Sequence, residues 1–266
     1  MSDLESGTAA NVDHDTGPQL SLLGSAHQLD INELRRLYDY PQQEPGVWIR
    51  ANFIASIDGG ATAGGVTSTL SGPGDRFLFN LLRSLADVIL VGAGTVRIEG
   101  YAGAHLTVTQ RQHRQDRGQS EVPQLAIVTN AGHLDRAMPV FTRTEVSPLI
   151  LTCASVAKET RHRLTGLAEV VDCSAENPHT VDEAVMVTKL ENRGLRQVLT
   201  EGGPTLLNSF IEREMLDELC LSLSPHLVGG QASRISTGPG EVLTRMRRAH
   251  ILADESGYLY TRYVKS

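Results

Sequence analysis

The residues best suited to chemistry follow three apolar stretches that each end in a glycine-rich turn. Asp58 comes directly after ANFIASI and precedes Gly59-Gly60, and Glu201 comes directly after LRQVLT and precedes Gly202-Gly203. The third junction is VGAGTV, at residues 91–96. A carboxylate beside a turn that has no side chains can face a ligand which the backbone approaches closely.

The junction at Glu201 predicts a phosphate site beside a carboxylate. Pro204 suits the first turn of a helix, and apolar residues at near-helical spacing follow it as far as Leu219. A helix that begins after such a turn offers unpaired N–H groups and a positive dipole end to a phosphate. Because a carboxylate repels a phosphate, we expect Glu201 to face a second, neighbouring ligand. A tight turn with a solvent-facing Glu201 is the alternative.

The other two junctions also have simpler interpretations. Asp58-Gly59 is a common turn pair, so Asp58 can be a turn residue only. VGAGTV is not the dinucleotide fingerprint G-x-G-x-x-G, because Arg97 stands where the last glycine is needed. The chain contains no GxSxG motif and no Walker A motif, and no Ser/His/Asp set stands out by its spacing.

Composition narrows the function class. The 266 residues carry a net charge of −7, which argues against a nucleic-acid surface and against binding to anionic membranes. No apolar run is long enough to cross a bilayer, and the acidic N-terminus lacks the apolar stretch of a signal peptide. The three cysteines form no CxxC pair and the nine histidines form no HxxxH or HxH pair. We therefore expect a cytoplasmic protein with no metal site.

The hydrophobic pattern predicts an N-terminal extension, residues 1–45, and one α/β domain, residues 46–266. Residues 1–19 have few apolar groups and are predicted to be disordered, whereas Asp30–Tyr38 has the spacing of a short helix. In the domain, helical patterns alternate with continuous apolar runs, which are typical of parallel strands buried on both faces. These runs are VWIRANFI (47–54), DVILVG (87–92), QLAIVT (124–129), PLILT (148–152) and EVVDC (169–173).

The patterns of four further segments predict the C-terminal strands, an arginine-rich loop and a helix start. The alternation in LCLSLS (219–224) and GYLYTRYVK (257–265) predicts half-exposed, antiparallel strands at one edge of the sheet. The arginine-rich residues 108–120 are interpreted as a solvated loop, with a basic face near a phosphate as the alternative. SGPGDRF predicts a helix start, and the residues expected to share the buried face of that helix are Phe77, Leu81, Leu82 and Leu85.

Taken in order, the motifs resemble one family over roughly Val47–Lys265. They are SIDG, then LRSLADVILVGAGTV, then LTEGGPTLLNSFIEREMLDELCLSLSPHLVGG. The chain resembles the riboflavin-biosynthesis reductases, that is, the C-terminal reductase domain of RibD, which has a dihydrofolate-reductase-like fold. It would be a stand-alone member, because no H-x-E or P-C-x-x-C zinc signature of a deaminase domain occurs. The resemblance implies a mostly parallel sheet flanked by helices, with antiparallel C-terminal edge strands.

The resemblance also implies an NADPH-dependent reductase that converts the ribose of a ribosylaminopyrimidine phosphate to a ribityl chain. Asp58 and Glu201 would be catalytic and would border the substrate together with Ala55, Ser56 and Ser71. The residues implied to hold the cofactor are Gly202, Gly203, Pro204, Thr205 and Leu206 at the pyrophosphate, Gly92, Thr95 and Val96 along the adenosine, and Thr129 and Asn130 near the ribose. Arg97 is a candidate for reading the 2′-phosphate.

The chain departs from the family in ways that keep other functions open. Gly60 stands where the family usually has a basic residue, and RIEGYAGAHLTVTQR replaces a segment that usually helps to hold the substrate phosphate. A dihydrofolate or pterin reductase and a non-catalytic nucleotide-binding protein are therefore the alternatives. We also expect a homodimer, because an exposed edge with Leu219, Leu221 and Leu223, or with Tyr258 and Tyr260, needs cover. The resemblance supports this, since family reductases associate through this end.

Overall fold

The computed structural model describes residues 28–41 and 46–266, and the chain divides into two units, residues 1–37 and 38–266. The predicted short helix is confirmed as α1 (Ile31–Tyr38). Asp30 caps it, because its Oδ1 accepts the backbone N–H groups of Asn32 at 2.7 Å and Glu33 at 2.8 Å. The predicted disorder of residues 1–19 lies outside the described residues. The division into an extension of residues 1–45 and a domain of residues 46–266 stays a prediction.

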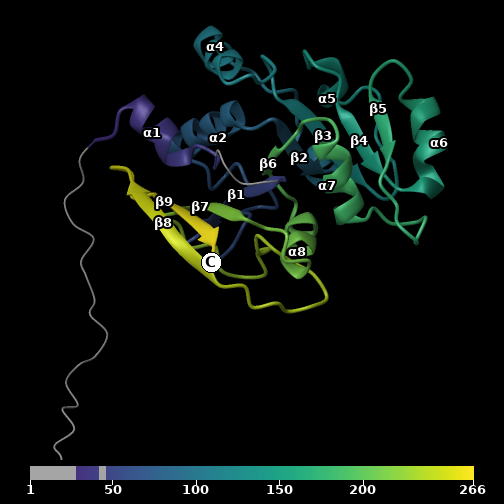
Figure 1. Ribbon diagram of the computed structural model, residues 1–266. Helices are drawn as coiled ribbons and strands as arrows, with labels where there is room; N and C mark the ends of the chain where they lie inside the picture. The colour runs from purple at the N-terminus through teal and green to yellow at the C-terminus, as the bar shows by residue number, and fades with distance from the viewer. Residues whose placement is uncertain (1–27, 42–45) are drawn as a thin grey trace, which may run out of the picture. The chain divides into compact units, whose positions relative to one another are not determined.

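Within the described residues, one nine-stranded sheet organises the second unit (Figure 1). The strand order is β5-β4-β3-β2-β6-β1-β7-β9-β8. Neighbouring strands are parallel from β5 to β7, and β9 is antiparallel to both β7 and β8. The predicted mostly parallel sheet with antiparallel C-terminal strands is confirmed. The strands are β1 (Trp48–Ser56), β2 (Val88–Gly92), β3 (Gln124–Thr129), β4 (Leu149–Thr152), β5 (Glu169–Asp172), β6 (Gln197–Thr200), β7 (Glu218–Ser224), β8 (Met246–Ala253) and β9 (Leu259–Lys265).

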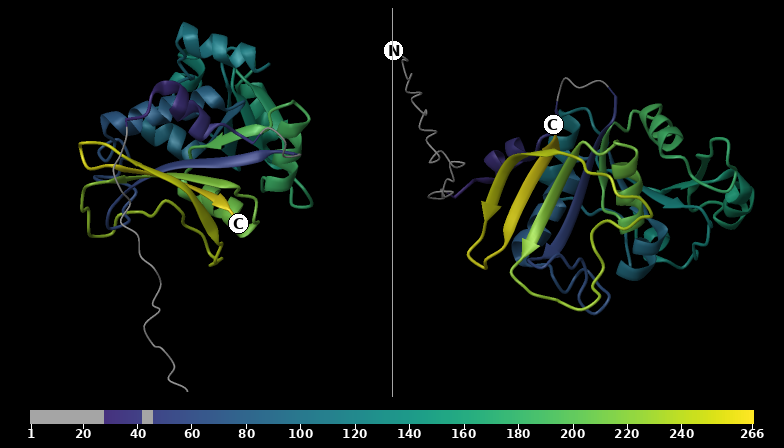
Figure 2. Two further views of the ribbon diagram at one scale, coloured as in Figure 1. Left: turned by 60° about the vertical axis from the view of Figure 1, so that its left-hand side comes forward. Right: turned by 90° about the horizontal axis from the view of Figure 1, so that it is seen from below.

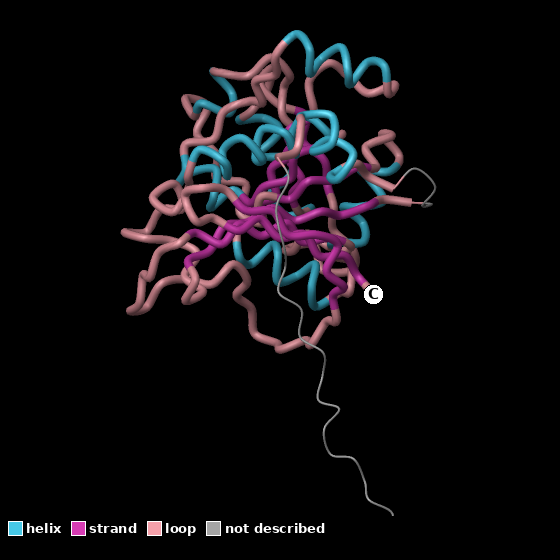
Figure 3. The backbone as a smooth tube through the Cα atoms, turned by 90° about the vertical axis from the view of Figure 1, so that its left-hand side faces the viewer, coloured by secondary structure: helices cyan, strands magenta, loops and turns pink. Residues whose placement is uncertain are grey.

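Helices pack on both faces of the sheet (Figure 3). On one face, Met186 and Phe210 join an apolar core with strand residues such as Leu90. On the other face, Val96 and Ala157 join a second core. The helices of this unit are α2 (Pro73–Leu85), α3 (Ala93–Glu99), α4 (Val108–Asp116), α5 (Pro139–Thr142), α6 (Ala154–Arg163), α7 (Glu183–Glu191) and α8 (Pro204–Glu212).

Helix α2 begins where the sequence predicts, with Gly72 as its N-cap and Pro73 as its first residue. Its buried face differs from the prediction at one position. Phe77 is 49% exposed and Leu78 is buried instead. The physical reason is the helical repeat, because Leu78 precedes the buried Leu81, Leu82 and Leu85 by three, four and seven positions.

The prediction that residues 219–224 lie at the edge of the sheet is wrong, although their antiparallel pairing is confirmed. Strand β7 lies inside the sheet, parallel to β1 and antiparallel to β9 (Figure 2). Its polar residues Glu218, Cys220, Ser222 and Ser224 are buried, while its three leucines are only half-buried. The other edge residues that were expected to be exposed, Tyr258 and Tyr260, are 6% and 5% exposed. Alternation shows that the two faces of a strand differ, but it does not identify the face that the fold covers.

The prediction of a solvated loop at residues 108–120 is also wrong. Residues 108–116 form α4, which starts with a capping box between Thr107 and Gln110. Arg111 binds Glu145 through Nη2 at 2.6 Å, and Arg114 is completely buried. Tertiary partners therefore make a helix of a segment whose polar composition suggested a loop.

Candidate active site

The three chemically promising junctions meet at one edge of the sheet. Strand β6 lies between β2 and β1, and all three strands are parallel. Their carboxyl ends therefore point to the same edge, at the place where the strand order reverses. Ligands of open α/β sheets bind in the crevice at this kind of position.

The junctions after β2 and β6 are in direct contact. The N–H of Gly92 donates to the carbonyl of Gly202 at 2.6 Å. A Cβ atom on Gly202 would lie 2.9 Å from the Phe53 ring, and one on Gly203 would lie 2.8 Å from Thr95 Oγ1. The Phe53 ring and the Thr95 hydroxyl lie so close that only glycine fits at these two positions without a shift of those side chains.

The start of α8 has the features of an anion site. Gly203 is the N-cap and Pro204 follows it, and no side chain caps the helix. Within residues 28–41 and 46–266, the first N–H groups of α8 consequently have no side-chain cap, and the positive end of the helix dipole lies at the same place. An anionic group such as a pyrophosphate fits this arrangement.

Glu201 does not face solvent, so the solvent-facing alternative is wrong. Glu201 is 7% exposed. Arg83 of α2 binds its carboxylate through two hydrogen bonds: Nε donates to Oε1 and Nη2 donates to Oε2, both at 2.7 Å. The Tyr101 hydroxyl donates to Oε2 at 2.8 Å. Arg83 neutralises the carboxylate, so that Glu201 would repel an anion at the start of α8 less strongly.

The partners of Glu201 are themselves packed against apolar surface. The Arg83 guanidinium lies 4.1 Å from the centre of the Phe79 ring. Burial opposes the charge of Arg83, but Glu201 outweighs that effect and holds the pKa of Arg83 above its ordinary value. Burial, followed by the charge of Glu201, raises the pKa of Tyr101 well above its ordinary value. Tyr101 is therefore a protonated donor at neutral pH.

Asp58 has a different environment. It is exposed, and its carboxylate accepts hydrogen bonds from the Ser56 hydroxyl and from the N–H groups of Val228 at 3.2 Å and Gly229 at 2.7 Å. The bond from Ser56, followed by those from Gly229 and Val228, lowers the pKa of Asp58 to about 2. The carboxylate is thus ionised at neutral pH, and it anchors the loop that follows β7.

The remaining predicted substrate residues lie close to Asp58 in the chain or at the start of α2. Ser56 is buried at the end of β1, and its Oγ also accepts the N–H of Gly60 at 2.9 Å. Ala55 is buried beside it. Ser71 precedes α2, and its hydroxyl donates to the carboxylate of Asp75, in the first turn of that helix, at 2.6 Å.

The predicted cofactor residues lie in three settings: the glycine junctions, the end of β3, and the starts of α3 and α8. Thr95 lies against Gly203, so it belongs to the glycine junctions together with Gly92. Thr129 and Asn130 end the neighbouring strand β3, where Asn130 Oδ1 accepts the N–H of Val181 at 2.7 Å. The buried Val96 and Leu206 contribute to the two apolar cores, and Thr205 is exposed.

Arg97 lines a pocket of about 490 Å³ between α3 and the loop after β3. Its guanidinium donates to the carbonyl of His133 at 3.2 Å. Arg163, from the end of α6, lines the same pocket, and its walls include Val96 and Met138. The pocket therefore combines two cations with one carboxylate, that of Asp135, and with apolar walls.

Sequence reasoning missed Arg83 and Tyr101. A signal existed for Arg83, because it interrupts the apolar pattern of LLRSLADVIL shortly before a buried strand. No pattern marks Tyr101. Its contact with Glu201 spans 100 positions of the chain and depends on the path of the segment after α3.

Residues 47–260 match the RibD C-terminal domain. The chain belongs to this family. It is 26% identical over 223 residues to the 2,5-diamino-6-ribosylamino-4(3H)-pyrimidinone 5′-phosphate reductase of Methanothermobacter thermautotrophicus, with 80% of this chain and 97% of that protein covered. It is 25% identical over 187 residues to the reductase of the same name from Archaeoglobus fulgidus, with 70% and 84% covered.

Solved structures show the same fold. A pyrimidine reductase-like protein from Corynebacterium diphtheriae superposes with a TM-score of 0.73 at 26% identity, covering 83% of this chain and 92% of that chain. A riboflavin biosynthesis reductase of Saccharomyces cerevisiae superposes with a TM-score of 0.65 at 14% identity, covering 90% and 100%. The predicted dihydrofolate-reductase-like fold of a RibD-type reductase is confirmed.

The part of the chain that the structure describes contains neither a candidate membrane span nor a candidate metal cluster. No helix in this part has the length and apolar character that a membrane crossing needs. No group of three or more His, Cys, Asp or Glu side chains among the described residues has the arrangement of a metal site.

Proposed function

We propose that the chain is an NADPH-dependent reductase that acts on a ribosylaminopyrimidine phosphate and yields the ribityl product. The observation that carries this proposal is the buried Glu201, held by Arg83 and Tyr101 directly before the uncapped start of α8. The names of the archaeal relatives supply the substrate class.

The residues present fit NADPH. The turn before α8 and the first residues of that helix, Gly202–Leu206, would hold the pyrophosphate, since the helix start offers N–H groups and a positive dipole end. Gly92, Thr95 and Val96 would lie along the adenosine, with Thr129 and Asn130 near the ribose. Arg97, in its pocket beside Arg163, is the proposed reader of the 2′-phosphate. When bound, NADPH supplies the electrons of the reduction as a hydride.

Glu201 is proposed to orient the substrate. A carboxylate has about four lone-pair sites. Among the described residues, Oε2 accepts from both Arg83 and Tyr101, whereas Oε1 accepts one hydrogen bond, from Arg83. Oε1 therefore keeps an acceptor site for an N–H or O–H group of the substrate. Its fixed partners hold this acceptor in one direction.

Asp58 is proposed to complete the other side of the site with Ala55, Ser56 and Ser71. With a pKa of about 2 it is not the proton donor at neutral pH. The exposed carboxylate can instead orient a water molecule or a polar group of the substrate. We therefore assign the delivery of the proton to water at this position.

A cofactor and substrate panel tests the proposal. NADPH oxidation is measured with the ribosylaminopyrimidine phosphate, dihydrofolate and a dihydropterin. We expect turnover with the ribosylaminopyrimidine phosphate. Turnover with dihydrofolate or the dihydropterin alone would identify that compound as the substrate instead. Calorimetric titration should show much weaker binding of NADH than of NADPH, and equal affinities would contradict the cofactor assignment. NADPH binding without turnover on any substrate would favour the nucleotide-binding alternative.

We also propose a homodimer, formed through the open face of the C-terminal strands. In the view from below, none of the described helices lies in front of β7, β9 and β8 (Figure 2). The half-buried Leu221 and Leu223 of β7 lie beside Thr261 and Leu259 of β9, and Leu259 is 41% exposed. Apolar side chains on an open sheet face need a partner surface, and a two-fold dimer is the commonest solution.

Sedimentation at micromolar concentration tests the dimer. We expect a species of twice the 28.8 kDa chain mass, and Leu221→Asp should convert it to the monomer. Leu243→Asp is the matched control, because Leu243 is fully exposed in the loop after β7. A monomeric wild type would contradict the proposal. The cytoplasmic location stays a prediction, for which cell fractionation is the test.

A further inference from the structure

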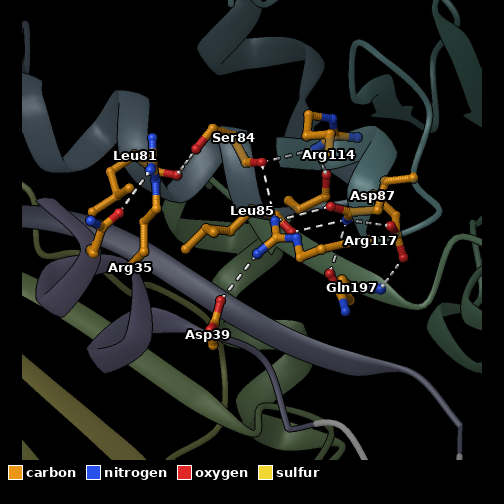
Figure 4. Close-up of polar contacts among 12 residues, drawn as sticks. Arg35, Asp39, Leu81, Ser84, Leu85, Asp87, Arg114, Arg117 and Gln197 are labelled. Atoms are coloured by element: carbon orange, nitrogen blue, oxygen red, sulfur yellow. Dashed lines mark hydrogen bonds and ion pairs between the residues drawn. The ribbon is translucent and has the colours of Figure 1, made fainter. Parts of the chain in front are cut away.

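Arg114 of α4 is a completely buried cation whose hydrogen-bond acceptors are carbonyl groups (Figure 4). Its Nε donates to Ser120 O at 2.7 Å, and its Nη1 donates to Ser84 O at 3.1 Å and to Ala86 O at 2.5 Å. Burial lowers the pKa of Arg114 to about 10, an effect that the charge of Asp87 opposes. Arg114 therefore remains charged at neutral pH.

Two of these carbonyls, those of Ser84 and Ala86, belong to the end of α2 and its C-cap. The helix ends at Leu85, and its C-cap Ala86 has an extended backbone, so the last carbonyls have no helical N–H partner. Gln119 Nε2 donates to Leu85 O at 3.1 Å, and Arg114 serves the carbonyls on either side of it. A cation at this position also complements the negative end of the helix dipole. The segment after α3 thus supplies the C-terminal cap of α2.

Arg83 lies in the helical turn that Arg114 holds. It immediately precedes Ser84, and its two bonds to Glu201 require a fixed direction of the guanidinium plane. A small rotation or shift of the last turn of α2 would break one of the two bonds. The buried cation of α4 and the Glu201 carboxylate are therefore connected through two successive residues of α2, Ser84 and Arg83.

We propose that Arg114 is a positioning residue for the reaction: it fixes the last turn of α2 and thereby aligns Arg83 on Glu201. This inference rests on the proposed function of Glu201. It gives the α4 segment a role in the active site without any contact with substrate or cofactor. The single substitution of choice is Arg114→Lys, which keeps the charge but lacks the fork that reaches several carbonyls.

Kinetics in two backgrounds distinguish positioning from general stability. In the wild type, Arg114→Lys should lower kcat/KM for the pyrimidine substrate by about 10- to 100-fold. In a Glu201→Gln background it should lower the residual kcat/KM less than about twofold, because the aligned pair is already lost. Arg114→Lys should lower the melting temperature by the same amount in the wild type and in the Glu201→Gln variant. The matched control is Arg111→Lys, on the same helix but bound to Glu145, which should leave kcat/KM unchanged.

A readout without turnover keeps this inference separate from the proposed function. The ¹⁵N–¹H signal of Arg83 Nε, assigned with Arg83→Lys, should be sharp and slowly exchanging in the wild type. Arg114→Lys should broaden it or speed its exchange, and Arg111→Lys should not. If the wild type reduces none of the substrates, the proposed function fails while this measurement still tests the alignment.

Two results would overturn the proposal. One is an Arg114→Lys enzyme whose Arg83 signal and kcat/KM are those of the wild type. The other is a loss of kcat/KM that is equally large with and without the Glu201 carboxylate, since a purely structural role predicts that result. For both outcomes the variant must be folded at the assay temperature, which the thermal melts establish.

Discussion

Asp58 and Glu201 share one local pattern, a carboxylate followed by two glycines, but their surroundings are opposite. Asp58 lies two residues after the end of β1, and Glu201 lies directly after the end of β6. The two strands are parallel neighbours in the sheet. Glu201 is buried against a guanidinium and a phenol. Asp58 is exposed and bound by a hydroxyl and backbone N–H groups.

The difference follows from what lies beside each strand end. The end of α2 brings Arg83 to Glu201, whereas the loop after β7 brings two N–H groups to Asp58. A buried charge needs a partner of opposite charge, because desolvation is costly. An exposed charge is stabilised by dipoles and by water. The same carboxylate–Gly–Gly pattern therefore gives a rigid acceptor in one place and a loop anchor in the other.

The largest effect is expected from Arg83→Met, which removes the cation that allows Glu201 to be buried. Loss of one partner of a buried pair typically costs about 3–5 kcal/mol of unfolding free energy. Urea unfolding should show that loss, and NADPH-dependent turnover should fall with it. Arg196→Met is the control, because Arg196 forms a surface pair with Glu191 and its side chain is 62% exposed. If Arg83→Met and Arg196→Met lost the same unfolding free energy, the buried pair with Glu201 would contribute no more to stability than the surface pair with Glu191.

Asp58→Asn tests the other carboxylate. It keeps the shape but removes the charge that receives two N–H groups and a hydroxyl, so the turn at the end of β1 should lose its alignment. We expect turnover to fall about 100-fold, the scale of a small misplacement, with nearly unchanged NADPH affinity in a calorimetric titration. Full turnover on every accepted substrate would leave Asp58 as a turn residue only.

Tyr101→Phe sharpens the comparison within the Glu201 site. It removes one hydrogen bond to a charged group, which is worth about 1.5–3 kcal/mol, while the Arg83 pair remains. We expect kcat/KM for the pyrimidine substrate to fall about tenfold, at the low end of that range. A wild-type value would show that Arg83 alone fixes the carboxylate.

The smallest effect concerns acid stability at Asp58. Its folded pKa of about 2 lies below the ordinary value of 3.8, so its contribution to stability is present above about pH 4 and is lost as the pH falls toward 2. The difference in melting temperature between wild type and Asp58→Asn should therefore shrink over that interval. A difference that stays constant between pH 5 and pH 2.5 would contradict the pKa shift.

The features that depend on residues close together in the chain could be predicted from the sequence. The apolar runs mark the parallel strands, SGPG marks the start of α2, and the glycine pairs mark the strand ends where ligands can approach. Strand length, helix starts and tight turns follow from side-chain spacing and backbone conformation, which are local properties. The order of the motifs was also sufficient for the family.

Which strand faces and which charges are covered depends on contacts between distant parts of the chain. Strand β7 buries its polar side, α4 forms around a buried arginine, and Glu201 is enclosed instead of solvent-facing. Each outcome depends on a partner far away in the chain. Arg83 and Glu201 are 118 positions apart, and Arg114 and Ser84 are 30 apart. Local spacing cannot supply such partners, because the free energy of burying a charge or a polar face depends on which groups the completed fold places against it.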